Sequence, residues 1–444
     1  MVKSITETLS FPSDFMWGTA TSAHQVEGHN PHNDWWDWER QPGRIADGAR
    51  ADVSCDWWHC AEKDFERAAT LDQNSHRLSI AWSRLEPHEG GWDEAAAARY
   101  REMLSALREN GITPMVTLHH FTSPRWLAED DGWANPAVVE RFVRFVRRAV
   151  EAFGDLVTLW CTINEPVIYA FDTYLGATFP PGQVSVGKAV RVLRHMAYAH
   201  AAAYDAIHGA QPEARVGFAK HQRAFAPANP VSALDGWAVG LRDYLANRLF
   251  MAAVMEGRLL FPLGWGQRDA GLVKRMDFVG LNYYNRDVLA FDPGALRNFF
   301  VREVRDSGRP PCIPAWWGDA DPDGLYRFLK EFAGYGLPVY VTENGWLDAT
   351  DEQRPYHLIT HLAAVHRALA EGVPVKGYYY WSLVDNFEWA EGFSSRFGLI
   401  AVDFETQART VRRSGELYAE ICGAGAITPG VVAQYVPHLV PTGL

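Results

Sequence analysis

Two glutamates are of interest because each ends an apolar stretch with the composition of a buried strand. Glu343 follows "VYVT" in "PVYVTENGW", and Glu165 follows "TIN" in "CTINEP". β-Branched and aromatic residues favour strands, and an Asn-Gly pair such as Asn344-Gly345 breaks them. One glutamate at a strand end is usually just solvated. The question is whether other residues place these two in one site.

A pair of facing carboxylates can hydrolyse a glycosidic bond. In the retaining form, one carboxylate attacks the anomeric carbon, while the other protonates the leaving oxygen and then deprotonates a water. The nucleophile must be ionised, which a nearby cation and hydrogen bonds favour. The acid must hold its proton, and the negative charge of its partner raises its pKa. These requirements do not say which glutamate has which role.

The composition favours a sugar site over an anionic partner. The chain has 18 Trp, 17 Tyr and 23 Phe, together 13% of its residues. Trp pairs a flat apolar face with one N–H donor, which suits the apolar faces and polar rims of sugars. The formal net charge of −12 argues against a nucleic acid or an anionic membrane as partner.

The N-terminus and the cysteines indicate a cytoplasmic protein. The opening "MVKSITETLS" lacks the apolar core of a secretory signal, and no apolar run approaches the roughly 18 residues that span a bilayer. No Asn-x-Ser/Thr sequon occurs. The scattered cysteines form no CxxC pair, which predicts free thiols and neither disulfides nor a zinc site. They are Cys55, Cys60, Cys161, Cys312 and Cys422.

Short apolar strands alternate with segments of helical period along the chain. The predicted strands are 15–21, 76–82, 113–120, 159–164, 215–221, 278–284, 338–344 and 377–383. A predicted helix over 94–111 stops at Asn110-Gly111, and one over 135–154 opens with Asn135 as N-cap and Pro136 as first helical residue. Eight such units predict a closed (β/α)8 TIM barrel as a single domain, residues 1–444. A doubly wound open sheet is the alternative, but no GxGxxG turn follows the first strand.

Polar side chains gather at the carboxyl ends of the predicted strands. This rim is where barrel enzymes build their active sites, because the strand ends converge there. The residues at strand ends are His119 and His120 in the third strand, Asn164 and Glu165 in the fourth, Asn282 and Tyr284 in the sixth and Glu343 in the seventh. Arg77 lies early in the second strand. Adjacent strand residues face opposite sides, so we expect His120 to point inward, His119 outward, and no metal between them. Cys161 is interpreted as a small buried residue.

Six segments, in chain order, resemble the family 1 glycoside hydrolases, the β-glucosidase family. "TINEP" and "VTENG" resemble its two signature segments, and "FMWGTATSAHQVEG" and "HRLSIAWSRLEP" its first two strands. "DFVGLNYY" resembles its sixth strand, and "WSLVDNFEWAEGFSSRFGLIAVDFETQARTVRRS" its last strand and following loop. The resemblance runs from about Phe11 to Tyr418. It implies a retaining β-glycosidase without cofactor that acts on small-molecule or oligosaccharide β-glycosides. Whether the protein forms a homo-oligomer is left open.

The resemblance also implies a role for each site residue. Glu343 would be the nucleophile, with Arg77 and Tyr284 holding it ionised, and Glu165 the acid/base. The residues implied to bind the sugar or support its pocket are Gln25, His120, Phe121, Asn164, Asn282, Tyr284, Trp381, Glu388, Trp389 and Phe397. In the long segment from about Phe291 to Gly324, we favour Trp317 as a further site residue over a core role for it.

Three of these implied roles are more specific. Asn164 would meet the 2-hydroxyl, where hydrogen bonds tighten in the transition state. Glu388 would accept from two adjacent hydroxyls, because a carboxylate has no donor to misplace. Trp381 would lie under the sugar ring, with a cis peptide to Ser382.

Departures from the family pattern bear on specificity. Phe121, in "HHFTSP", stands where the family commonly has Trp in HWDLP. It keeps the ring but loses an N–H donor toward the 3-hydroxyl, which weakens the case for strict glucose selectivity. His24 replaces a common Tyr, and "GHNPHNDWWDWE" is similar to a broad-specificity branch. The choice among β-glucosides, β-galactosides and β-fucosides is therefore left open.

Related classes are less consistent with the sequence. The 6-phospho-β-glycosidases replace the glutamate at position 388 and add Lys and Tyr, which "FSSRFGLIAVDF" lacks. Thioglucosidases carry Gln where this chain has Glu165, and relatives that only bind sugar have lost one of the two glutamates. Transfer of the sugar to an acceptor other than water is left open.

Overall fold

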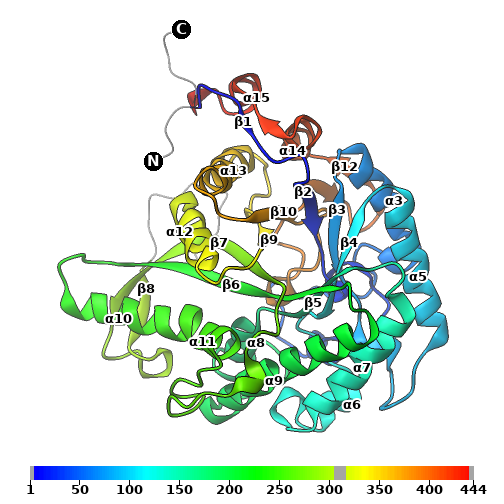
Figure 1. The fold of residues 1–444 in the computed structure, drawn as a ribbon, viewed down its shortest axis with the longest axis vertical. Helices are drawn as coiled ribbons and strands as arrows, with labels where there is room; N and C mark the ends of the chain where they lie inside the picture. Colours follow the sequence, from blue (N-terminus) through cyan, green and yellow to red (C-terminus); the bar gives the residue numbers. More distant parts are fainter. Residues whose placement is uncertain (1–4, 305–316, 440–444) are drawn as a thin grey trace.

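The computed structural model describes residues 5–304 and 317–439, and its centre is a closed barrel of eight parallel strands (Figure 1). Around the barrel the order is β2, β3, β4, β5, β6, β7, β9 and β10, and the β10–β2 pairing closes it. These strands are Met16–Ala20, Ser75–Ser79, Thr113–His119, Leu159–Asn164, Arg215–Pro227, Phe278–Phe291, Val339–Asn344 and Val375–Trp381. All eight predicted strands and the predicted fold class are confirmed.

Helices surround the barrel and cover the outer faces of its strands, while the inner faces pack against one another inside the barrel. Every residue of β5 and of β9 is buried, as expected for parallel strands enclosed by helices. The longer helices are α3 (Trp57–Thr70), α5 (Glu94–Glu109), α7 (Val138–Phe153), α8 (Pro166–Tyr174), α9 (Val186–Ala210), α10 (Ala233–Asp243), α11 (Leu249–Glu256), α12 (Pro322–Ala333), α13 (Arg354–Ala370) and α14 (Arg413–Ala424).

Shorter helices lie in the connections. Within the described residues they are α1 (Ala23–Val26), α2 (Asp34–Trp38), α4 (Trp82–Leu85), α6 (Arg125–Glu129) and α15 (Pro429–Tyr435). There are also 3-10 turns at Gly132–Ala134, Ala270–Leu272, Leu296–Asn298, Trp389–Glu391 and Pro437–Leu439, and a π-helical turn, η2 (Tyr244–Arg248).

The start of α7 differs from the prediction, whereas the end of α5 agrees with it. α5 ends at Glu109 with Asn110 as C-cap. α7 begins at Val138, two residues after the predicted start at Pro136. Asn135 still accepts the N–H of Ala137 through its side chain, at 2.9 Å. The Asn-Pro pair thus marks the approach to the helix and not its first turn.

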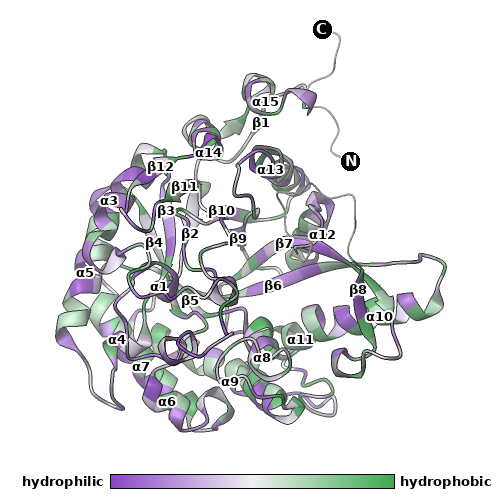
Figure 2. Ribbon diagram, turned by 180° about the vertical axis from the view of Figure 1, so that it is seen from behind, coloured by the Kyte–Doolittle hydropathy of each residue, from purple (hydrophilic) through white to green (hydrophobic). Residues whose placement is uncertain are grey.

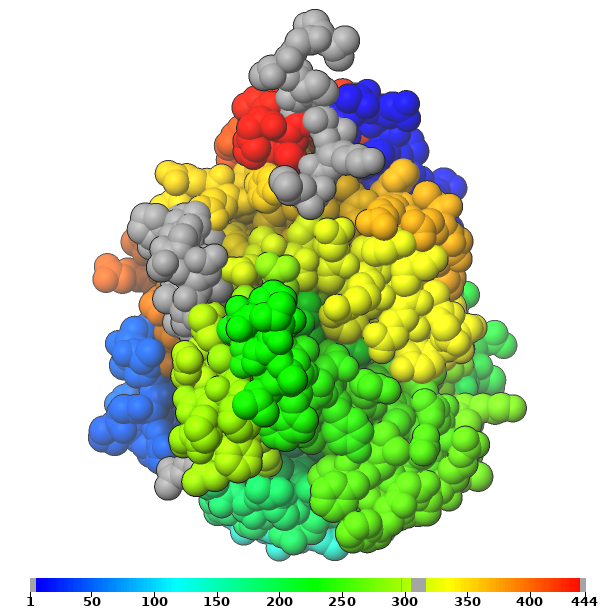
Figure 3. All heavy atoms as spheres, turned by 90° about the vertical axis from the view of Figure 1, so that its left-hand side faces the viewer, coloured from blue at the N-terminus to red at the C-terminus, as the bar shows by residue number. Residues whose placement is uncertain are grey.

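β6 and β7 continue well past the barrel rim, which the sequence analysis missed. They pair as far as Pro227 and Leu289, and β8 (Val301–Val304) adds to β7 in antiparallel register. β6 carries the polar run Lys220–Arg223 and is largely purple in Figure 2. The extended ends of β6 and β7 lie side by side on one flank of the molecule (Figure 3).

The two ends of the described chain lie together at one end of the molecule (Figure 1). β1 (Leu9–Ser10) pairs antiparallel with β13 (Ala426–Ile427). None of the helices within residues 5–304 and 317–439 is long and apolar enough to cross a membrane. Cys55, Cys60, Cys161 and Cys422 are free thiols, and Cys312 and Trp316 lie outside the described residues.

Candidate active site

Glu343 and Glu165 lie at the carboxyl rim of the barrel and belong to one hydrogen-bonded network. Glu343 is in β9, and Glu165 follows β5 as the N-cap of α8, with a left-handed φ of 44°. Their exposed fractions are only 3% and 7%. Asn282 donates to Glu165 at 2.7 Å and to Asn164 at 3.1 Å. Arg77 completes the path, because it donates to Asn164 at 2.7 Å and to Glu343 at 2.5 Å.

Glu343 accepts hydrogen bonds on both carboxylate oxygens. Arg77 Nη1 donates to Oε1, and the Tyr284 hydroxyl donates to Oε2 at 2.6 Å. Arg77 is fully buried and is fixed by a bond from its Nε to Thr117 at 3.0 Å. Burial opposes its charge, but Glu343 beside it outweighs that effect, so the pKa of Arg77 rises. Burial raises the pKa of Tyr284 well above its usual value, so it stays a donor. Such contacts favour an ionised carboxylate.

Glu165 has the opposite electrostatic surroundings. Burial, followed by the negative charge of Glu343, raises the pKa of Glu165 to about 8, although the hydrogen bond from Asn282 lowers it. Glu165 therefore holds a proton at neutral pH. A carboxyl group that keeps its proton, beside a carboxylate that accepts from a cation and a hydroxyl, is what general acid catalysis beside a nucleophile requires.

A group of rings forms one wall of the site. The His120 ring stacks on Trp381 and Trp389, with centroids 5.8 and 6.0 Å away, and its Nε2 lies 3.1 Å from Asn164 Nδ2. Burial lowers the pKa of His120 well below its usual value, so the ring is neutral and Nε2 accepts. Phe121 packs against Trp389 at 5.2 Å and against Phe179 at 5.3 Å. These rings offer a flat apolar surface beside polar groups.

His119 lies on the other face of β4. It accepts a hydrogen bond from Trp133 Nε1 at 3.0 Å and contacts the Tyr169 ring at 5.3 Å. His119 and His120 thus have separate partners. The one group of potential metal ligands within the described residues, His29, Asp56 and His59, contains none of the predicted site residues.

Gln25 and Glu388 form the polar part of the pocket. Gln25 Nε2 lies 3.1 Å from Glu388 Oε2 and 3.0 Å from Asn386 Oδ1. Burial, followed by the charge of Glu343, raises the pKa of Glu388 to about 8. The Trp381–Ser382 peptide is cis, as the family resemblance implied.

Trp317 and Phe397 lie beside Tyr284. The ring centroids of Trp317 and Tyr284 are 5.6 Å apart, and those of Trp317 and Phe397 are 5.1 Å apart. Trp317 therefore contacts the site through the ring of a residue that touches Glu343. The predicted site residues, which come from both ends of the chain, are all brought to this one rim.

The sequence analysis missed Lys220 near the site, and it noted His24 only as a departure from the family pattern. Lys220 on β6 is buried, donates to the Ala246 carbonyl at 2.8 Å, and has its pKa lowered to about 7 by burial, which the charge of Glu165 opposes. His24 stacks on Trp389 with centroids 5.8 Å apart. The "AKHQR" run at the end of the fifth strand was the available signal for Lys220. No pattern in the sequence around His24 indicates that its ring stacks on Trp389.

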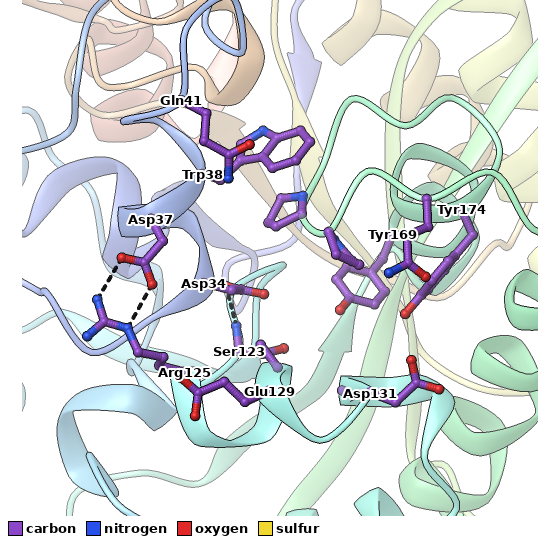
Figure 4. Close-up of a pocket in the computed structure, with 15 residues that line it drawn as sticks. Asp34, Asp37, Trp38, Gln41, Ser123, Arg125, Glu129, Asp131, Tyr169 and Tyr174 are labelled. Carbon is purple, nitrogen blue, oxygen red and sulfur yellow. Dashed lines mark hydrogen bonds and ion pairs between the residues drawn. The ribbon is translucent and has the colours of Figure 1, made fainter.

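A separate cavity of about 470 Å3 lies beside α2 and α8 (Figure 4). Two of its acidic groups already have partners, because Asp37 accepts two hydrogen bonds of 2.7 Å from Arg125 and Asp34 accepts the Ser123 N–H at 2.9 Å. None of the predicted site residues lines it. The carboxylate pair at the barrel rim is therefore the better candidate for an active site.

A (β/α)8 barrel with two buried carboxylates and aromatic rings at its carboxyl rim defines the class of barrel glycosidases. The family model for glycosyl hydrolase family 1 matches residues 7–425, and the chain belongs to that family. It is an enzyme of the β-glucosidase type.

Three similar proteins support this assignment. β-Glucosidase A of Thermotoga maritima is 33% identical, over 93% of this chain and 97% of its own. A β-galactosidase of Pyrococcus woesei is 31% identical, over 94% of this chain and 98% of its own. The solved structure of a β-glycosidase from Pyrococcus horikoshii superposes with a TM-score of 0.88 at 35% identity, covering 98% of this chain and 99% of that one.

Proposed function

We propose that the protein is a retaining β-glycosidase that cleaves terminal non-reducing β-D-glucosides, together with β-galactosides and β-fucosides. The observation that carries the proposal is the contrast between the two glutamates. Glu343 accepts from Arg77 and Tyr284, whereas Glu165 has a pKa of about 8. One is equipped to attack and the other to give a proton.

The reaction proceeds in two displacements. In the first, a Glu343 oxygen forms a bond to the anomeric carbon as the bond to the leaving oxygen breaks, and Glu165 gives its proton to that oxygen. In the second, Glu165 takes a proton from water, and the water oxygen replaces Glu343 at the same carbon. Arg77 and Tyr284 hold Glu343 in position for the attack and stabilise it again when it is released.

The pocket residues account for sugar binding. Asn164, fixed by Arg77 and Asn282, is placed to bind the 2-hydroxyl. Glu388 and Gln25 form a connected polar pair for adjacent hydroxyls. Phe121 has no donor for the 3-hydroxyl, and curated relatives named β-glucosidase and β-galactosidase are similar to this chain to nearly the same degree. Both observations support a site that accepts β-galactosides, the 4-epimers of β-glucosides, as well as β-glucosides.

The test is hydrolysis of p-nitrophenyl β-glucoside, β-galactoside, β-fucoside and β-glucoside 6-phosphate by the wild type and Glu343→Gln. We expect turnover of the neutral sugars, the β-anomer as first product by NMR, and a loss of at least about 10⁴-fold in the variant. An α-anomer as first product would exclude retention. Turnover of only the phosphorylated sugar, or sugar binding without turnover by the folded wild type, would overturn the proposal.

The roles of the two glutamates are separated by leaving-group chemistry. A dinitrophenyl leaving group needs no proton, so Glu165→Gln keeps the first displacement on dinitrophenyl β-glucoside and loses it on alkyl β-glucosides. Glu343→Gln loses the first displacement on both kinds of glucoside. If the two variants lose the first displacement equally on dinitrophenyl and on alkyl β-glucosides, the assignment of Glu165 as the acid is wrong.

A further inference from the structure

Two histidines and an aspartate gather near the start of α3, away from the two glutamates at the rim. They are His29, Asp56 and His59, and one ligand atom of each lies within 4.8 Å of the other two. His29 lies in the connection that follows α1, Asp56 is the N-cap of α3, and His59 is in the first turn of that helix. α3 is on the outside of the barrel (Figure 1), so the three side chains belong to its outer layer.

The carboxylate of Asp56 faces both imidazole rings. Its Oδ1 lies 2.6 Å from His59 Nδ1 and 3.3 Å from His29 Nε2, and the centroids of the two rings are 5.0 Å apart. An aspartate at an N-cap usually accepts a backbone N–H of the first helical turn. The side chain of Asp56 accepts none from α3. Asp56 therefore contacts the two rings in place of the usual partners of a helix cap.

The types of ligand atom select a transition-metal ion of borderline softness. Imidazole nitrogen and carboxylate oxygen together suit Zn²⁺, Ni²⁺ and Cu²⁺, whereas Mg²⁺ and Ca²⁺ prefer oxygen ligands alone. Around a tetrahedral Zn²⁺ with bonds of about 2.0–2.1 Å, neighbouring ligand atoms are about 3.3 Å apart. The distance between His29 and Asp56 already has this value. The His59 ring needs to move away from Asp56 by less than about 1 Å.

The backbone holds the two ligand-bearing segments close together. Gly28 has a left-handed φ of 68°, and a Cβ there would overlap the Val53 carbonyl. The N–H of His29 donates to the Asp52 carbonyl at 2.6 Å. His29 and Asp56 each have a left-handed φ of 54°, a conformation that persists in such residues only where the surrounding structure holds it. The ligands are therefore placed before an ion binds, which lowers the entropy cost of binding.

Water can complete the coordination of an ion at this place. The side chains of His29, Asp56 and His59 are 41%, 27% and 61% exposed, so solvent reaches all three. The neighbouring Cys60 is a poor fourth ligand, because metal ions bind the thiolate. Burial, followed by the charge of Asp56, raises the pKa of the Cys60 thiol, and its Sγ donates to the Asp56 carbonyl at 3.1 Å.

We propose that His29, Asp56 and His59 bind one divalent transition-metal ion of the Zn²⁺ type. The ion fastens the segment after α1 to the start of α3 and so stabilises the fold. These same segments meet at Gln25, whose backbone carbonyl accepts from the Ser54 hydroxyl. The inference does not depend on the proposed function, because no step of glycoside cleavage uses the ion. The scattered cysteines predicted no zinc site, and none of them is a ligand here.

The experiment is a calorimetric titration of tag-free protein, stripped with a chelator and dialysed, with ZnCl2 and with MgCl2. We expect one equivalent of Zn²⁺ to bind with a Kd of about 10 µM or lower, and Mg²⁺ not to bind. Alanine suits the helical position of His59, and asparagine tolerates the left-handed φ of Asp56. His59→Ala and Asp56→Asn should each raise the Kd at least about tenfold.

His208→Ala is the matched control. His208 forms a partly exposed pair with Asp277 at 2.8 Å, remote in sequence from the three ligands. This variant should bind Zn²⁺ as the wild type does.

Two further measurements locate the ion. The electron paramagnetic resonance spectrum of the Cu²⁺-loaded wild type should show coupling to two imidazole nitrogens, and that of His59→Ala to one. Because the ion binds the folded protein, Zn²⁺ should raise the Tm of the wild type and of Cys60→Ser, but not that of Asp56→Asn.

The outcomes decide both the site and its role. Zn²⁺ binding that is unchanged in His59→Ala and in Asp56→Asn, or that is lost only in Cys60→Ser, overturns the proposal. A wild-type Tm that does not respond to Zn²⁺ overturns it as well. Turnover of p-nitrophenyl β-glucoside by the metal-free protein should equal that of the loaded protein, and a kcat that depends on Zn²⁺ would contradict the structural role.

Discussion

Arg77 and Glu343 form a buried ion pair, with 2.5 Å between Nη1 and Oε1 and side-chain exposures of 0% and 4%. The pair joins β3 to β9, which are not neighbouring strands, so it fixes the proposed nucleophile against another part of the barrel. The second guanidinium nitrogen of Arg77, Nη2, donates to Asn164. One cation therefore positions both the attacking carboxylate and the residue proposed to bind the 2-hydroxyl.

Arg77→Gln is expected to impair both activity and stability. Removal of one partner from a buried ion pair typically costs about 3–5 kcal/mol, because the other charge is left without compensation. Loss of the aligned donors should lower kcat by about 10²–10³-fold. The measurements are kcat on p-nitrophenyl β-glucoside for the folded fraction and the free energy of unfolding in urea.

Arg84→Gln is the matched control for that experiment. Arg84 and Glu27 form another buried pair, at 2.7 Å with exposures of 7% and 2%, and neither is a proposed site residue. This variant should lose stability to a similar degree and keep its kcat per folded molecule. Equal losses of kcat in the two variants would mean that Arg77 has only a structural role.

The pH dependence of activity should report the pKa of Glu165. Because Glu165 must be protonated to act as the acid and its pKa is about 8, kcat/KM for alkyl glucosides should fall as the pH rises through about 8. The hydrogen bond from Asn282 lowers this pKa, so Asn282→Ala should move the alkaline fall to higher pH. Asn285→Ala, which removes a donor that does not reach Glu165, should leave it in place. A shift to lower pH in Asn282→Ala would contradict the argument.

The barrel strands could be predicted because parallel strands buried on both faces are short continuous apolar runs. The positions of the rim residues could be predicted as well, because Asn164 and Glu343 are held in place by the strands that carry them. The extension of β6 could not be predicted, because Lys220–Arg223 is a polar run whose strand pairing is with β7, about 60 residues later in the chain. The stack of His24 on Trp389 joins residues far apart in the chain, and no local pattern reports it.

Glu388→Gln should change the dependence of stability on pH. The pKa of Glu388 in the folded protein is about 8, above its usual value of 4.5. Its contribution to stability is therefore fully present below about pH 4.5 and is lost as the pH rises through about 8. A glutamine at this position does not titrate, so the free energy of unfolding of the variant should rise by about 1–3 kcal/mol relative to that of the wild type across this interval. The change is limited because Glu388 is partly exposed.

Urea unfolding at pH 4.5, 6.5 and 8.5 measures that gain. Glu405→Gln serves as the control, because Glu405 is an exposed surface glutamate and should show no trend across these pH values. A stability difference between Glu388→Gln and the wild type that stays constant with pH would show that Glu388 does not ionise in this interval.

Phe121→Trp tests whether the missing indole donor sets sugar recognition. Trp at this position is common in the family and adds an N–H toward the 3-hydroxyl, so the ratio of kcat/KM for p-nitrophenyl β-glucoside to that for its 3-deoxy analogue should rise about two- to tenfold. The site is crowded, because Phe121 is 4% exposed and packs on His120, Phe179 and Trp389 at 5.0–5.3 Å. Overpacking should therefore cost about 1–3 kcal/mol of stability. Phe179→Trp adds the same volume beside Phe121 and should lower stability without changing the ratio. An unchanged ratio in Phe121→Trp would mean that the indole N–H does not reach the sugar.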